Sequence, residues 1–289
     1  MKNQTGQKIK TGFTRAAKIT RRYAKSFYFA SLFLTREKRN AAYSIYAICR
    51  LSDEATDKDA SLIELSTAKR NIDAVYSGKE LNMSILLSFK ESVNNYSIPR
   101  HYFDELIDGM YMDFNKNRYK DFSELKTYCY RVAGVVGLMM LQIFGFKDFE
   151  AKNYDVNMGI AMQLTNILRD LKEDFKRGRI YLPQEEMASF GVSENDIAKA
   201  IVNDNFKLML KFQIDRTRRF YEDSEPGIMM ITDSRCRFVA WVMKEVYSGI
   251  LDEIEKNNYD VFSKRAYVGL WGKLTRVFRA YRRSRKNEN

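Results

Sequence analysis

The chain has 289 residues, of which 45% are hydrophobic and 30% are charged, so it can bury a sizeable core and is not a disordered chain. Its formal net charge is +12, but the basic excess lies in residues 1–25 and 264–289, and the residues between them are net acidic. The single histidine, His101, excludes a histidine-rich zinc site and a Ser-His-Asp triad.

Apolar residues recur at intervals of three and four along most of the chain, which is typical of α-helices, and alternating strand patterns are scarce. Only 3 prolines and 14 glycines are present, too few for the turns of a many-stranded β fold. We therefore predict an all-α single domain over residues 1–289, with a basic N-terminal segment 1–22 and a basic amphipathic C-terminal helix at about 264–286. The predicted helices are 12–25, 36–57, 61–77, 82–95, 100–117, 122–145, 149–176, 194–223, 227–257 and 263–283.

The cysteines and the hydropathy pattern bear on the cellular compartment of the chain. Cys49, Cys129 and Cys236 are odd in number and lack CxxC spacing, which indicates reduced thiols in a cytoplasmic chain. No apolar run approaches ~18 residues, and no hydrophobic segment follows the basic start. We therefore expect neither a transmembrane span nor a signal peptide.

The first polar pattern occupies one face of the helix predicted over 36–57. Two carboxylates one turn apart repel each other unless a cation lies between them, which is how a helix presents oxygen ligands to Mg²⁺. Such pairs are also common on solvated helix faces, so this pattern alone is weak evidence. Its members are Tyr43, Tyr46, Arg50, Asp53 and Asp57.

A second polar stripe lies on a helix whose flanking residues are apolar, and it consists of Gln163, Asn166, Asp170 and Asp174. Buried carboxylates are costly unless they are paired or bound to metal. Two such helices facing each other would offer four carboxylates and a carboxamide to Mg²⁺, whose other ligands are usually water and substrate phosphate, so the implied substrate is a diphosphate. The alternative is a pair of internal salt bridges to Arg50 and Arg169.

A third pattern places small residues on one face of the segment Tyr128–Gly137, next to Tyr130. Glycine inside a helix costs about 1 kcal/mol relative to alanine. The two glycines, Gly134 and Gly137, therefore indicate either close helix packing or room for a ligand.

These motifs make the chain similar to the squalene/phytoene synthase family, all-α enzymes that join two prenyl diphosphates head to head. The resemblance runs from about Tyr23 to Lys273 and includes Asp108–Asp113, the stretch Arg179-Ile-Tyr-Leu-Pro183 and the ending Tyr247-Ser-Gly-Ile-Leu. It implies an isoprenoid-synthase-type helical bundle around a central cavity. Within the family the chain resembles the bacterial presqualene diphosphate synthases of hopanoid biosynthesis, and phytoene synthases come next.

The resemblance also implies roles for individual residues. The side chains facing Mg²⁺, or Mn²⁺ in its place, are Asp53, Asp57, Asn166, Asp170 and Asp174. The residues matching substrate-binding positions are Tyr23, Ala24, Lys25, Ser26, Tyr46, Arg50, Gln163, Arg169, Tyr247 and Arg265. The implied catalytic set is Tyr46, Arg50, Asp53, Asp57, Tyr130, Asp170 and Asp174. The family often has a polar residue where Ala24 stands.

The implied activity is a Mg²⁺-dependent 1′-1 condensation of two farnesyl diphosphates to presqualene diphosphate, continuing in some members to squalene or dehydrosqualene. NADPH is required only if the reaction proceeds to squalene. The alternative is a phytoene synthase that condenses two geranylgeranyl diphosphates. Ser31 stands where C30 enzymes often carry phenylalanine and so favours the longer substrate, whereas bulky Tyr43 and the segment 247–265 favour the shorter one. A scaffold protein that has lost the chemistry is disfavoured because all four aspartates and Asn166 are present.

The last predicted helix has one apolar face, made of Tyr267, Leu270, Trp271, Leu274, Val277, Phe278 and Tyr281. Basic residues occupy the rest: Lys273, Arg276, Arg279, Arg282 and Arg283. This pattern suits a helix lying on an anionic membrane, here the inner face of the cell membrane. The alternative is that the apolar face packs on the protein body. Nucleic-acid binding is not expected, because the body is net acidic and has no groove-reading motif.

Overall fold

The computed structural model describes residues 2–57 and 62–286, and side chains are described for residues 4–53 and 62–285. The described residues form helices and loops with no β-strand, apart from two isolated backbone bridges. The helices are α1 (Lys2–Tyr23), α2 (Lys25–Ser31), α3 (Arg36–Asp57), α4 (Leu62–Tyr76), α5 (Ser84–Asn95), α6 (Arg100–Asn115), α7 (Phe122–Cys129), the π-helix η1 (Tyr130–Gly134), α8 (Val135–Phe144), α9 (Ala151–Arg169), α10 (Leu171–Lys176), α11 (Gln184–Ser189), α12 (Glu194–Ala198), α13 (Asp204–Asp223), α14 (Glu225–Met230), α15 (Ser234–Lys256) and α16 (Leu270–Lys286).

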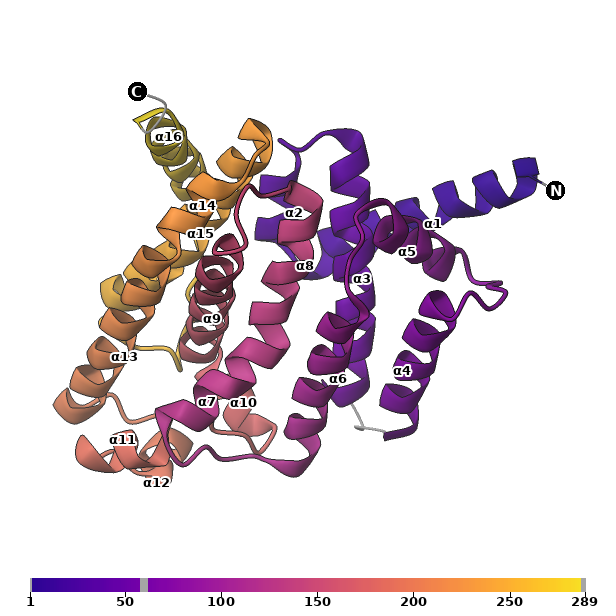
Figure 1. Cartoon of the computed structure of the whole chain (residues 1–289). Helices are drawn as coiled ribbons and strands as arrows, with labels where there is room; N and C mark the ends of the chain where they lie inside the picture. The colour runs from indigo at the N-terminus through magenta and orange to yellow at the C-terminus, as the bar shows by residue number, and fades with distance from the viewer. Residues whose placement is uncertain (1, 58–61, 287–289) are drawn as a thin grey trace.

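The long helices run side by side, and two of them organise the rest (Figure 1). Helix α3 contacts α1, α4, α5 and α6, and α9 contacts α13, α14, α15 and η1. Helix α8 contacts both α3 and α9 and so joins the two groups. The first aspartate motif lies in α3, and the second begins in α9 and continues into α10.

Helix boundaries follow the predictions where apolar periodicity is uninterrupted, as in α3, α4, α5 and α6. Two predicted helices, 194–223 and 227–257, are each divided, because a polar side chain caps a new helix inside them. Asn203 accepts a hydrogen bond from the backbone N–H of Phe206 at the start of α13, and Asp233 accepts from Arg235 and Cys236 at the start of α15.

The predicted helix 122–145 contains a π-helical turn, η1, and the small residues in this segment serve close packing. A Cβ on Gly137 would lie 2.6 Å from Oδ2 of Asp155, and a Cβ on Gly159 would lie 2.6 Å from the backbone of Gly134. Close helix packing is therefore what the glycines provide. By length and composition the stretch Phe122–Phe144 could cross a membrane, contrary to our expectation that no segment could; half of it is buried, as in the core helix of a globular domain.

Both ends of the chain differ from the prediction. The first helix begins at Lys2 and ends at Tyr23, and a separate helix, α2, follows after Ala24 leaves the helical region with φ −128° and ψ 61°. The last helix begins at Leu270 instead of residue 263. Residues 265–269, just before it, are not helical, and their burial alternates, with Ala266 and Val268 buried and Tyr267 exposed, which does not follow the helical repeat.

Candidate active site

The end of α3 carries the first acidic motif. Arg50 donates from Nη1 to Oδ2 of Asp53 at 2.5 Å, and its guanidinium carbon lies 4.7 Å from the ring centre of Tyr23. Tyr46, one turn earlier, packs against Phe27 with 5.7 Å between ring centres. Burial, reinforced by the neighbouring Tyr247, raises the pKa of the Tyr46 hydroxyl, so this group stays protonated.

Asp57 is the last residue of α3, and its side chain lies outside the described residues. Its expected pairing with Asp53 therefore stays a prediction.

The second acidic motif lies where α9 gives way to α10. Asp170 has φ −105° and ends α9, and α10 starts at the next residue, so the predicted continuous helix 149–176 is divided here. Its carboxylate accepts two hydrogen bonds from Arg169, at 2.7 and 2.5 Å, and two from Arg265, at 2.7 and 2.9 Å. Burial would raise the pKa of Asp170, but these two arginines outweigh it and lower the pKa.

Asp174 is in a different electrostatic state from Asp170. Burial first, and then the negative charge of Asp170, raise its pKa to about 8. A buried carboxyl beside another carboxylate is a group that a cation would stabilise. Within α9, the Asn166 amide donates a hydrogen bond to the side-chain oxygen of Gln163 at 3.4 Å.

Tyr247 on α15 connects the two motifs. Burial raises its pKa, Arg169 and Arg265 lower it, and Asp170 raises it. Tyr247 also raises the pKa of Tyr46. The structure therefore brings Tyr46 of α3, Tyr247 of α15 and the Arg169–Asp170 pair together with Arg265, although these residues are far apart in the chain.

The junction of α1 and α2 supplies Tyr23, Ala24, Lys25 and Ser26. Lys25 is exposed, and Ala24 and Ser26 are half-buried. Lys273 of α16 lies near Lys25: burial, followed by the positive charge of Lys25, lowers the pKa of Lys273. Two lysines facing each other favour an anion between them.

Lys273 was not among the predicted site residues. The resemblance ends at this residue, but the helical pattern places it on the charged flank of the last helix, and this obscured its position near Lys25.

None of the contacts given above links Tyr130 to the two acidic motifs. It lies in η1, and burial, then Glu105 and Tyr102 of α6, raise its pKa. Its predicted role beside the reacting carbons stays a prediction.

A further polar cluster that the sequence prediction missed lies beside Asp174. Asp113 of α6 accepts hydrogen bonds from the hydroxyls of Tyr128, at 3.1 Å, and Tyr181, at 2.9 Å. Arg179 donates to the backbone oxygen of Asp113 at 3.2 Å. Asp113 also raises the pKa of Asp174, so the cluster contributes to the electrostatics of the second motif. Its sequence signal was present, since the stretches 108–113 and 179–183 belong to the resemblance.

The aspartates were expected to act either as ligands of Mg²⁺ or as partners in internal salt bridges, and the structure bears on both alternatives. In this structure Asp53 and Asp170 form salt bridges, the arrangement expected of internal ion pairs. Among residues whose side chains are described, no three His, Cys, Asp or Glu side chains form a metal-binding group. The donor set, carboxylates and amide oxygens, nevertheless has the hard oxygen ligands that Mg²⁺ prefers. The pKa of the buried Asp174 stays raised although Arg177 and Arg179 lower it, so a further cation would stabilise its ionised form. The residues therefore fit Mg²⁺ by donor type.

Comparisons with known proteins identify the family. The sequence model of the family described as squalene/phytoene synthase matches residues 20–272. The 15-cis-phytoene synthase of Synechococcus elongatus is 38% identical over 282 residues, covering 92% of this chain and 91% of the relative. Phytoene synthase 1, chloroplastic, of Solanum lycopersicum is 39% identical over 287 residues, covering 96% of this chain and 69% of the relative.

Solved structures agree on the fold. A crystal structure of a dehydrosqualene synthase in complex with ligand has a TM-score of 0.93 at 27% identity, covering 98% of this chain and 99% of that chain. Squalene synthase HpnC from Alicyclobacillus acidocaldarius has a TM-score of 0.80 at 24% identity, covering 87% of this chain and 96% of that one. The predicted all-α, isoprenoid-synthase-type fold is confirmed. On the match over residues 20–272 and the identity to full-length relatives, the chain belongs to the squalene/phytoene synthase family and is a prenyltransferase.

Proposed function

We propose that the chain condenses two geranylgeranyl diphosphates head to head to phytoene. The observation that carries this proposal is the identity of 37–41% to proteins named phytoene synthase over nearly the whole chain, against 27% to the dehydrosqualene synthase. These comparisons support the alternative over our first preference, farnesyl diphosphate. Either substrate, farnesyl or geranylgeranyl diphosphate, would undergo the same class of reaction, a head-to-head condensation.

Contacts of α2 with α3 support the longer substrate. Ser31 is fully buried, and its hydroxyl lies 2.7 Å from that of Tyr43 and 2.8 Å from the backbone oxygen of Tyr28. The Tyr43 ring is also stacked on Tyr28, with 5.4 Å between ring centres. Tyr43 is thus held against α2 by Ser31 and Tyr28.

The acidic residues would act on the diphosphates. Mg²⁺, when bound, supplies Lewis-acid and electrostatic stabilisation of the leaving diphosphate. Asp53, Asp57, Asn166, Asp170 and Asp174 would hold it, as their oxygen-donor chemistry suits this ion. Arginine forks match phosphate geometry well, so the cations around these aspartates would bind diphosphate oxygens. Those cations are Lys25, Arg50, Arg169 and Arg265.

Aromatic side chains would protect the reacting carbons. Loss of diphosphate leaves an allylic cation, which water would otherwise capture. Tyr46 is partly buried against Phe27 and stays protonated, so it presents a neutral ring to this cation. The second substrate's double bond attacks the cation, and loss of a proton closes a cyclopropane that keeps one diphosphate. Phytoene then forms by loss of this second diphosphate, rearrangement of the ring and loss of a second proton.

Product analysis tests the substrate assignment. The purified chain would be incubated with Mg²⁺ and either geranylgeranyl or farnesyl diphosphate, with and without NADPH. We expect phytoene from the first substrate without NADPH and much less product from the second. Preferential conversion of farnesyl diphosphate would refute the C20 assignment, and no product from either substrate would refute the condensation.

Ser31→Phe gives a sharper test of chain length. The larger ring would enter a fully buried position beside Tyr43, so we expect the ratio of C40 to C30 product to fall by about tenfold or more. Ser31→Ala is the matched control, since it removes the hydroxyl without adding volume. An unchanged product ratio in Ser31→Phe would contradict the role of this position.

We also propose that the chain associates peripherally with an anionic membrane through its basic C-terminal helix, since its product is a water-insoluble lipid. The supporting observation is that large apolar side chains of α16 are exposed. Deletion of residues 275–289 should reduce co-sedimentation with liposomes. Equal binding by the shortened chain would contradict the role of this helix.

A further inference from the structure

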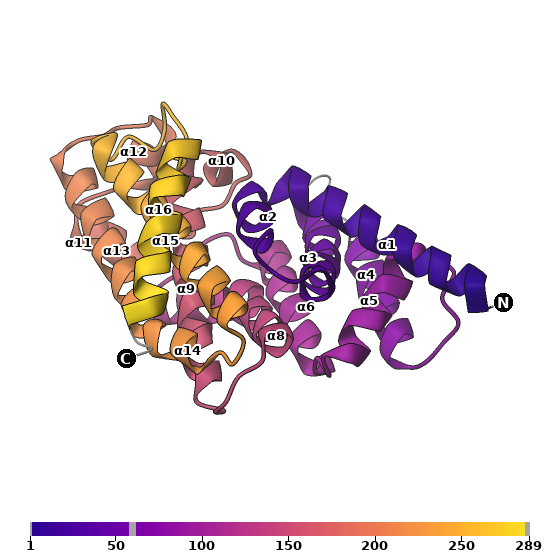
Figure 2. The ribbon, with the colours of Figure 1, turned by 90° about the horizontal axis from the view of Figure 1, so that it is seen from above.

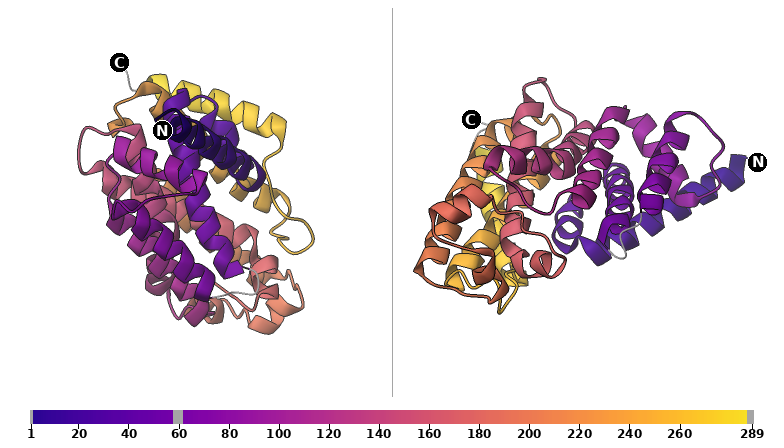
Figure 3. Two further views of the ribbon diagram at one scale, coloured as in Figure 1. Left: turned by 90° about the vertical axis from the view of Figure 1, so that its right-hand side faces the viewer. Right: turned by 90° about the horizontal axis from the view of Figure 1, so that it is seen from below.

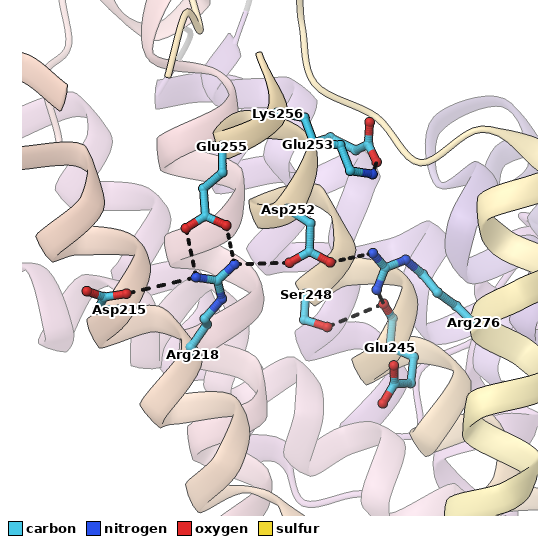
Figure 4. A network of polar contacts seen from close by, with 9 residues as sticks. All are labelled: Asp215, Arg218, Glu245, Ser248, Asp252, Glu253, Glu255, Lys256 and Arg276. Carbon is cyan, nitrogen blue, oxygen red and sulfur yellow. Dashed lines mark hydrogen bonds and ion pairs between the residues drawn. The ribbon is translucent and has the colours of Figure 1, made fainter. Parts of the chain in front are cut away.

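Helix α16 lies on the protein body with a charged side chain facing inward. Arg276 is only 7% exposed and donates to the backbone oxygen of Glu245 at 3.0 Å and to Asp252 at 2.6 Å. Its guanidinium lies directly over Gly249 of α15, where any Cβ would overlap it. Asp252 in turn accepts from Arg218 of α13 at 3.0 Å, so the contact continues into the body (Figure 4).

A second set of contacts fixes the other end of the helix. Arg283 forms ion pairs with Glu225 at 2.6 Å and with Glu245 at 3.2 Å. Ala280, between the two arginines, is fully buried. The buried charge of Arg276 is stable only in a defined geometry, so it fixes the rotation of α16 about its axis, and the half-exposed Arg283 pairs with the body in the same orientation. A cavity of about 380 Å³ remains between α15 and α16, lined by polar and charged residues that include Arg276 and Asp252.

This rotation turns the apolar face of α16 outward. Trp271 is 81% exposed, Phe278 62%, Leu274 45% and Tyr281 43%. These residues recur at intervals of three and four, so they form one stripe. An amphipathic helix on a globular body ordinarily buries such a stripe, and here it is exposed instead. Our alternative expectation, that the apolar face packs on the protein body, is therefore wrong for these four residues.

The stripe continues onto α2. Tyr281 contacts Phe238 of α15, with 6.4 Å between ring centres, and Phe238 contacts Phe33, at 5.2 Å. Phe33 and its neighbour Leu32, just beyond α2, are 40% and 49% exposed. We call Leu32, Phe33, Trp271, Leu274, Phe278 and Tyr281 the outer apolar face.

Basic side chains surround this face. The Arg282 guanidinium lies 5.9 Å from the ring centre of Phe278, and that of Arg285 lies 4.8 Å from Tyr281. Seen from above, α1 and α16 lie toward the viewer with α2 between them (Figure 2). The side view places α1 and α16 both in the upper part of the molecule (Figure 3, left). Helices α1, α2 and α16, which carry or adjoin the two basic ends of the chain and the outer apolar face, therefore lie on the same side of the molecule.

We infer that the outer apolar face docks onto an anionic lipid bilayer, with aromatic rings at the level of the headgroups and arginines on the lipid phosphates. The face borders the site, because Lys273 of α16 lies near Lys25 and 5.9 Å from the ring centre of Phe29. The docked enzyme would thus hold its diphosphate-binding lysines close to the surface that contains prenyl substrates and product. This inference rests on the peripheral membrane association proposed above and identifies the surface that performs it.

Vesicle binding by point variants tests the inference in the full-length chain. The vesicles would contain phosphatidylcholine with about one-quarter phosphatidylglycerol, or phosphatidylcholine alone. Trp271→Ser/Phe278→Ser and Leu32→Ser/Phe33→Ser should each lower the fraction bound to anionic vesicles by about tenfold or more. Ile63→Ser and Leu208→Ser are matched controls, since these apolar residues are 75% and 57% exposed on other helices, and they should bind like the unmodified chain.

Tryptophan fluorescence gives an independent readout. The chain has 2 tryptophans, and Trp241 is buried at 2% exposure, so a change on adding vesicles reports Trp271. Anionic vesicles should shift the emission to shorter wavelength, and phosphatidylcholine alone should shift it less. Circular dichroism and condensation activity in detergent would show that each variant is folded.

Four results would overturn the inference. Binding by the unmodified chain that neither double variant weakens would leave membrane association standing but assign it to another surface. No vesicle binding by the unmodified chain would refute both the association and this surface, while activity in detergent would leave the condensation intact. Equal binding to neutral vesicles would refute the role of anionic lipid. A dimer in sedimentation that only the Trp271 and Phe278 variant converts to monomer, without loss of vesicle binding, would assign the face to a second copy of the chain.

Discussion

The two acidic motifs of the site are held in different ways. Asp53 has 43% of its side chain exposed and pairs with Arg50, three residues away on the same helix. Asp170 has 19% exposed and pairs with two arginines, one of them 95 residues away in the segment before α16. The pair of Asp53 with Arg50 therefore lies within one helix, whereas the pair of Asp170 with Arg265 depends on tertiary structure.

The two acidic motifs should therefore differ in their sensitivity to substitution. A partly exposed pair in a helix is screened by water and can rearrange at little cost. A partly buried carboxylate held by two guanidinium forks is pre-organised, and losing it leaves two cations without their partner.

The largest effect is expected for Asp170→Asn. It removes the charge that compensates both arginines and, on our proposal, one group facing the metal, so kcat/KM should fall by about 10³-fold or more. Steady-state assays with geranylgeranyl diphosphate and Mg²⁺ measure this. Glu194→Gln, which removes an ion pair with Arg118, is the control and should retain activity. Full activity in Asp170→Asn would contradict its assigned role.

A smaller loss is expected for Asp53→Asn, about 10²-fold in kcat/KM, because its pair with Arg50 lies within one helix and is partly exposed to water. The same assay, repeated at several Mg²⁺ concentrations, measures it. A loss equal to or greater than that of Asp170→Asn would remove the proposed difference between the two motifs.

Arg265→Gln should reduce kcat/KM by about 10-fold to 100-fold, since it removes one of the two forks on Asp170. When Arg265→Gln is combined with Asp170→Asn, the changes in activation free energy derived from kcat/KM should be non-additive by about 1 kcal/mol or more, because the two side chains share one network. Combined with Asp53→Asn it should be additive. Additivity with both, measured as a double-mutant cycle, would contradict the long-range support of Asp170.

The smallest effect on activity, and a distinct effect on stability, is expected for Asp155→Asn. Asp155 lies on α9 like Asp170, but burial raises its pKa from 3.8 to about 7, and its Oδ2 has no hydrogen-bond partner among the described residues. Between these values the folded chain binds more protons than the unfolded chain, so the free energy of unfolding falls as pH rises from about 4 to about 7 and stays low above that.

Asp155→Asn should abolish that fall. The gain in stability over the unmodified chain should grow from about pH 4 to about pH 7 and then level off, reaching a few kcal/mol, since a tenfold change in a protonation equilibrium is worth about 1.4 kcal/mol. Thermal unfolding at several pH values measures it, with Asp233→Asn as the control, because Lys38 already lowers the pKa of Asp233. A stability difference that does not change with pH would contradict the raised pKa.

Local features of the site could be predicted from the sequence. Helical spacing places Tyr46, Arg50 and Asp53 on one helix, and α3 has the predicted bounds. Asn166 and Gln163 likewise lie on the same side of α9, as their hydrogen bond shows. The residues compared lie within about two turns of one helix, so their relative positions depend only on the helical repeat.

Contacts that join distant segments could not be predicted in this way. The pairing of Asp170 with Arg265, and that of Asp113 with Tyr181, depend on how loops return to the body. The outward rotation of α16 depends on Arg276 fitting over Gly249. A helical pattern states which residues share a face, and only tertiary contacts decide which face is turned inward.

The π-helical turn at Tyr130–Gly134 has a consequence for insertions and deletions. Adjacent residues of an α-helix are rotated by about 100° from each other, so removing one residue from this turn would rotate everything on one side of it. Either Tyr128 would leave Asp113, or Gly137 would leave Asp155 and a larger residue would take its place against α9. The number of residues between Tyr128 and Gly137 is therefore constrained as tightly as their identities.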